Sequence, residues 1–198
     1  MLGQARVGIM TNAKIDLANF FYKHSEEKYQ SGDIKGAIND LDQAIKNNPT
    51  EAKYYESRIA IFIAQAWEND HSYNRHMAEF FWRLALKDYE TFLDLIDYID
   101  IHKDYARRGD IKSRLKDYQG AIGDYERAIK IKRKNKDLLD EDKKYFLMFE
   151  SLLYFKCACI KRDLREYKIA IRYFDKSIEG GGSHITYISR GMTKLAIN

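Results

Sequence analysis

The chain has 198 residues, 45% of them hydrophobic, and its 34 Lys and Arg against 30 Asp and Glu give a formal net charge of only +4. This balance excludes a strongly basic nucleic-acid binder on composition alone, and the length suits one elongated domain. A single proline, Pro49, and the scarcity of apolar alternation with period two indicate an all-α protein.

The sequence predicts a cytoplasmic protein with no membrane segment. No stretch approaches the roughly 18 apolar residues of a membrane-spanning helix, and the first ten residues lack the apolar core of a secretion signal. Cys157 and Cys159 are two residues apart in a helical pattern. Their side chains therefore point to different faces, which argues against a disulfide and fits a reducing compartment.

Four segments repeat one pattern, in which an alanine is followed by polar positions around a large residue and then by a small or apolar residue. In chain order they are AINDLDQAI from Ala37, ALKDYETFL from Ala85, AIGDYERAI from Ala121 and AIRYFDKSI from Ala170. Recurrence of this kind is typical of a chain built from copies of one helical unit.

Each of these segments follows another amphipathic segment with an aromatic anchor. The anchors are Phe21, Tyr55, Tyr105 and Tyr154, with a fifth, Tyr187, near the end. Four residues after the anchors come Ser25, Ile59, Gly109, Ala158 and Gly191, which are small in four of five cases. Small side chains let two helix backbones approach, so each unit is predicted to be an antiparallel helix pair.

These positions resemble the tetratricopeptide repeat, most clearly in YARRGDIKSRLKDYQGAIGDYERAI from Tyr105 to Ile129. The resemblance covers about residues 18–198 and implies a right-handed α-α superhelix. We expect one domain, 1–198, with repeats at about 18–51, 52–101, 102–135 and 151–183 and a capping helix at 184–198. That last helix carries an apolar stripe that would suit packing as a cap, formed by Ile185, Ile188, Met192 and Leu195.

The spacing of the four alanines predicts two insertions. The intervals are 48, 36 and 49 residues, whereas the family's repeat is about 34 residues long. The insertions fall within 67–82 and 130–146, and neither segment contains proline or glycine, so each is expected to lengthen helices. The first is rich in aromatic residues, for which core packing is the simpler explanation and a second binding surface or a dimer contact the alternative.

The resemblance implies that the first helices of successive repeats line a concave surface that binds a peptide or protein segment. The residues expected on that surface are Tyr22, Glu26, Tyr29, Lys53, Glu56, Lys103, Arg107, Asp110, Phe155, Cys159 and Arg162. Tyr and Arg contribute disproportionately at interfaces. The predicted function is therefore a non-enzymatic interaction scaffold, or adaptor.

Some family members bind the carboxylate tails of heat-shock chaperones with Lys and Asn from two repeats and Lys and Arg from a third. Lys103 and Arg107 match the third-repeat pair. Tyr22, Glu26 and Ser57 stand where the other repeats need Lys, Asn and Asn. Half of the clamp is missing, so chaperone-tail binding is not expected.

An alternative function is RNA association through the basic region 102–136, which holds Lys130, Lys132, Arg133, Lys134 and Lys136. Such a cluster can attract phosphates, although a solvated helix end is the preferred explanation. The five histidines lack metal-ligand spacing, and no carboxylate pair or nucleophile stands out. We therefore predict no enzyme activity, no metal and no cofactor.

Overall fold

The computed structural model describes residues 12–96, 101–134 and 140–197, with the side chains of 132–134 and 140–143 left aside. Within these ranges there are nine α-helices and no strand, which confirms the all-α prediction. The helices form two compact units, Met1–Ile96 and Asp97–Asn198. The single domain expected from the sequence stays a prediction.

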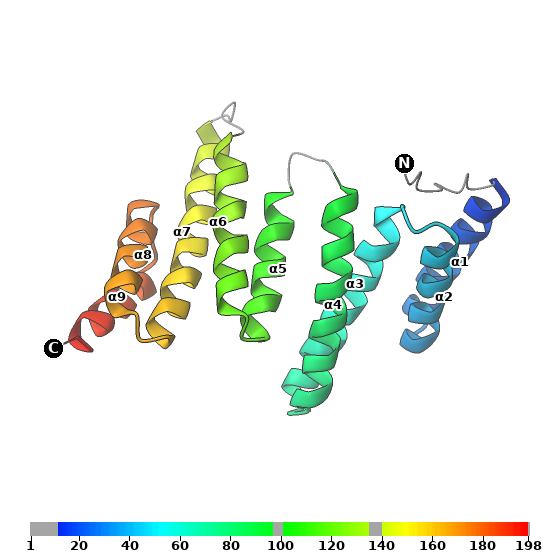
Figure 1. Cartoon of the computed structure of the whole chain (residues 1–198), viewed down its shortest axis with the longest axis horizontal. Helices are drawn as coiled ribbons and strands as arrows, with labels where there is room; N and C mark the ends of the chain where they lie inside the picture. Colours follow the sequence, from blue (N-terminus) through cyan, green and yellow to red (C-terminus); the bar gives the residue numbers. More distant parts are fainter. Residues whose placement is uncertain (1–11, 97–100, 135–139, 198) are drawn as a thin grey trace, which may run out of the picture. The chain divides into compact units, whose positions relative to one another are not determined.

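The first unit consists of two helix pairs, α1 (Asn12–Gln30) with α2 (Ile34–Asn47) and α3 (Ala52–His71) with α4 (Arg75–Leu95), as Figure 1 shows. In the first pair, Ala37, Leu41 and Ala44 are fully buried. They form a core with residues of α1 and α3, among them the fully buried Tyr54. The spacing of these apolar residues along α2 places them on one face, which drives the packing.

The second unit contains α5 (His102–Arg114), α6 (Tyr118–Lys134), α7 (Asp140–Asp163), α8 (Tyr167–Glu179) and α9 (His184–Leu195). The repeated alanines Ala121 and Ala170 are fully buried, as Ala37 and Ala85 are in the first unit. Gly109 of α5, which packs against Ala121 and Tyr125 of α6, must also be small. A methyl group added to Gly109 would lie 2.7 Å from the ring of Tyr125.

Longer helices accommodate the predicted insertions. α3 and α4 have 20 and 21 residues, against 14 for α2, and α7 has 24, against 13 for α8. Part of the second insertion, residues 135–139, lies outside the described residues. In the first insertion Trp82 is 5% exposed and meets Trp67 edge to face at 5.6 Å, so part of its aromatic content packs inward. A dimer contact there stays untested.

The orientation of α9 differs from the expectation that its apolar stripe packs inward. The side chains that α9 buries are Thr186, Ser189 and Thr193. The predicted stripe is exposed instead, with Ile185, Ile188, Met192 and Leu195 at 52%, 58%, 63% and 76%. The physical reason is register: counted from the anchor Tyr187, the stripe occupies the positions that Lys53 and Glu56 hold in α3, and these face away from the second helices.

The turns inside the four pairs share one backbone conformation. Gly32, Tyr73, Lys116 and Arg165 all have positive φ, of 85°, 60°, 63° and 61°. In three turns the next residue caps the following helix, as when the Asp33 carboxylate accepts a hydrogen bond of 2.9 Å from the Gly36 N–H. The left-handed residue therefore belongs to the repeat's turn and does not mark a functional site.

Candidate functional site

A buried ion pair joins the two helices in three of the four pairs. The carboxylate belongs to the third residue after the repeated alanine, which is Asp40, Asp88 or Asp124, and each of these residues is 4% exposed. The cation comes from the first helix of the same pair. Lys28 Nζ lies 2.8 Å from Asp40, Arg58 Nε 2.7 Å from Asp88, and Arg108 Nη2 2.6 Å from Asp124.

These charges hold the helix pairs together and are already matched. Burial raises the pKa of Asp88, although Arg58 acts against this by donating two hydrogen bonds of 2.7 Å to its carboxylate. In the fourth pair Tyr173 and Cys157 take the corresponding positions, and burial raises the pKa of the Cys157 thiol to about 12. A buried charge with its partner in place is structural and is not presented to a ligand.

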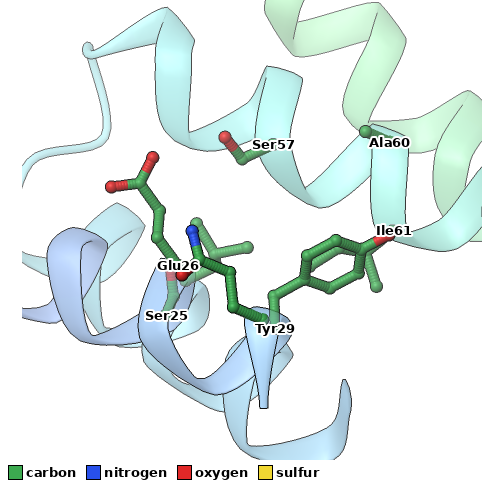
Figure 2. A pocket seen from close by; sticks show the side chains of 8 residues that line it. Ser25, Glu26, Tyr29, Ser57, Ala60 and Ile61 are labelled. Carbon is green, nitrogen blue, oxygen red and sulfur yellow. The ribbon is translucent and has the colours of Figure 1, made fainter. Parts of the chain in front are cut away.

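The first unit contains a pocket of about 240 Å³ between α1, α2 and α3. Its floor is buried, since Leu41, Ser25 and Ile61 are 0%, 2% and 5% exposed. Glu26, Tyr29 and Gln30 of α1 and Ser57 and Ala60 of α3 form the walls. Figure 2 shows the Glu26 and Tyr29 side chains reaching from α1 toward α3. Two of the predicted binding residues, Glu26 and Tyr29, therefore line one cavity.

Tyr22 borders this pocket. Its hydroxyl makes side-chain hydrogen bonds with Ser57 and Glu26, and its ring lies 5.3 Å from that of Tyr54. Burial is the main cause that raises the pKa of Tyr22, and the negative charges of Glu26 and Glu56 add to it. The negative charges of Glu26 and Glu56 therefore both act on the Tyr22 hydroxyl, beside the pocket.

Lys53 lies beside the pocket and is held by its neighbours. Its ammonium nitrogen is 5.3 Å from the ring centre of Tyr22 and 5.4 Å from that of Tyr54, and it donates a hydrogen bond of 3.4 Å to Asn19 Oδ1. The five predicted residues of the first unit thus gather in and around one surface. Sequence reasoning missed Gln30, and it assigned Ser25 only to packing, although its small side chain leaves the opening above Leu41.

The predicted residues of the second unit are more strongly engaged with the protein itself. Arg107 Nη1 lies 3.3 Å from the buried carboxylate of Asp104, and Lys103 is exposed. Asp110 accepts hydrogen bonds from the Tyr125 hydroxyl at 2.7 Å and from Lys156 Nζ at 2.6 Å, so it links α5, α6 and α7.

The expected residues of α7 have similar roles. Phe155 and Cys159 pack against the core cluster around Phe174, where the Phe155 and Phe174 ring centres are 5.9 Å apart. Arg162 Nη2 lies 3.2 Å from the Asp163 carboxylate. These residues of α7 thus make contacts within the protein, whereas Glu26 and Tyr29 line a pocket.

The basic region that supported the RNA alternative is partly neutralised. Arg108 and Lys112 both pair with Asp124, and the Arg127 guanidinium lies 4.7 Å from the ring centre of Tyr105. Lys130 is exposed. The side chains of 132–134, and residues 135 and 136 entirely, lie outside the described residues.

The described ranges contain neither a metal-binding cluster nor a membrane-spanning helix. No three His, Cys, Asp or Glu side chains in the described part of the chain lie close enough to hold a metal ion. Among the helices that the structure describes, none combines the length and the apolar character needed to cross a membrane.

Comparison with known proteins places the fold. A family model for the tetratricopeptide repeat matches residues 105–135. A crystal structure of MamA superposes with a TM-score of 0.57 at 16% identity, covering 92% of this chain and 87% of that one. The apo form of RapI gives a TM-score of 0.51 at 19% identity, covering 87% of this chain and 58% of that one. At these identities the likeness shows the fold, an all-α helical-repeat superhelix.

Proposed function

We propose that this chain, which belongs to the tetratricopeptide repeat family, is a non-enzymatic scaffold that binds a peptide or protein segment on the exposed face of its first helices. Members of this family are typically protein-interaction scaffolds. The observation that supports the proposal here is the pocket between α1 and α3, with its buried floor and mixed walls.

The packed helix pairs favour binding by a preformed surface. The pocket's floor belongs to the core of the first unit, so Leu41 and Ile61 are fixed before a partner arrives. A rigid surface leaves most of the ordering cost to the partner segment. We assign the main contacts to Tyr22, Glu26, Tyr29, Lys53 and Glu56. Within the second unit we assign contacts to Lys103, Arg107, Phe155 and Arg162.

A random heptapeptide library, displayed on phage and panned against the whole chain, tests this proposal. Peptides that are selected should bind the wild type in a fluorescence anisotropy titration and bind Tyr29→Ala at least about tenfold more weakly, because an aromatic wall of the pocket is lost. Tyr145→Ala, which removes a tyrosine that is 73% exposed on α7, is the matched control and should retain binding. Equal affinity of every selected peptide for wild type and Tyr29→Ala would overturn the proposal.

A further inference from the structure

We propose that the pocket between α1 and α3 selects a cationic side chain, lysine or arginine, from a basic peptide segment. This inference rests on the proposed function and adds the chemical class of the partner. It is carried by the position of Glu26 in the pocket wall, by the lack of an ion pair to Glu26 among the described residues, and by the apolar floor below.

Glu26 and Glu56 differ from the buried carboxylates of the first unit. Asp40 and Asp88, each 4% exposed, both form an ion pair with a cation of the same unit. Among the residues that the structure describes, no Lys, Arg or His forms an ion pair with Glu26 or Glu56. Among the described residues, the carboxylates at this end of the pocket therefore have no cation in direct contact.

Lys53, a cation beside the pocket, is engaged by other groups. The Lys53 ammonium lies over the rings of Tyr22 and Tyr54 and donates to Asn19, and Lys53 is not among the residues that line the pocket. Tyr22, a neutral residue, is the hydrogen-bonding partner of Glu26. A cation from a partner could thus approach Glu26 from inside the pocket without displacing Lys53.

The rest of the pocket suits the stem of a long cationic side chain. Lys and Arg side chains bury their methylene groups against apolar surface while the charged head keeps polar partners. Leu41, Ile61 and Ala60 supply the apolar surface. The Glu26 carboxylate, the Gln30 amide and the Ser57 hydroxyl can accept hydrogen bonds from the head, and the Tyr29 ring offers a face to a cation.

The same charge opposes an acidic partner at this pocket. A carboxylate seated there would lie beside Glu26 with no pocket cation to offset the repulsion. This preference is opposite in sign to that of a carboxylate clamp, so the charge of the peptide is a sharp test.

The test compares the peptides enriched by the whole chain with those enriched by Glu26→Gln, both panned against the random heptapeptide library. Wild type should enrich peptides with a Lys or Arg at one position, and Glu26→Gln should lose this enrichment. For a synthetic copy of a selected lysine peptide, acetylation of that lysine and Glu26→Gln should each weaken binding roughly tenfold, because each removes a charge-assisted contact. Glu27→Gln is the matched control, since it removes an exposed carboxylate of the same helix outside the pocket, and affinity should change less than twofold.

The outcomes separate this inference from the proposed function. Peptides that depend on Tyr29 yet carry no basic residue, and bind Glu26→Gln as well as wild type, would overturn the cationic preference and leave the groove in place. Selected peptides that are insensitive to Tyr29→Ala would overturn both. Far-UV circular dichroism of each variant ensures that the comparison is made between folded proteins.

Discussion

Replacing Asp124 by Asn should destabilise the second unit by about 3 kcal/mol. The Asp124 carboxylate accepts hydrogen bonds from Arg108 Nε at 2.8 Å and Nη2 at 2.6 Å and lies 2.9 Å from Lys112 Nζ. Removing one partner of a buried ion pair costs about 3–5 kcal/mol. The Arg108 and Lys112 side chains are 15% and 16% exposed, so water can partly solvate both cations and the lower end of that range applies.

Urea unfolding followed by far-UV circular dichroism measures this loss. With a slope of about 1.5 kcal/mol/M, the midpoint of the second unit should fall by about 2 M. Both tryptophans, Trp67 and Trp82, belong to the first unit, so tryptophan fluorescence follows that unit separately. Glu179→Gln removes an exposed charge from the same unit and should change stability by less than about 0.5 kcal/mol. If Asp124→Asn costs no more than this control, the ion pair does not hold α5 to α6.

Three further outcomes are expected. When the native protein is treated with a thiol reagent at pH 8, the half-buried Cys159 should react and Cys157 should not, because burial raises the pKa of the Cys157 thiol to about 12 and keeps it protonated. Labelling of both cysteines at equal rates would contradict this. Arg165→Gly should raise the free energy of unfolding by up to about 1 kcal/mol, since glycine adopts positive φ without strain; a lower urea midpoint would refute it. Gly109→Ala should lower the free energy of unfolding by about 1–3 kcal/mol, because the added methyl group clashes with the Tyr125 ring. Gly191→Ala has open space around it and should stabilise α9 by about 0.5–1 kcal/mol. Thermal melts that rank the two variants in the reverse order would refute the packing argument.

The helix pairs were predictable because their packing requires small residues at recurring positions in the sequence. Ala37, Ala85, Ala121 and Ala170 mark the points of closest approach, and all four are fully buried. The buried carboxylates are just as periodic in the sequence, but an Asp on an amphipathic helix is usually solvated. Only the structure shows that Asp88 and Asp124 face cations of the preceding helix.

The candidate site was predictable in part. Counting from the anchor Phe21 predicts Glu26 and Tyr29 on one face, and in the structure both residues line one pocket. The same kind of count failed for α9, where the apolar stripe was expected to pack inward. Hydrophobicity alone does not tell which neighbour a helix meets, whereas the small residues Thr186 and Ser189, at the contact, do.

The α7/α8 pair differs from the other three in how it should respond to heat. At the positions of the buried ion pairs it has Cys157 and Tyr173, and the hydroxyls of Ser151 and Ser177 each donate a 2.8 Å hydrogen bond to the other residue's carbonyl oxygen. The cost of withdrawing charges from water falls as temperature rises, so the ion-paired helix pairs gain relative to this one on warming. Thermal unfolding should accordingly begin at α7 and α8, and this pair sets the highest temperature at which every helix pair is still folded.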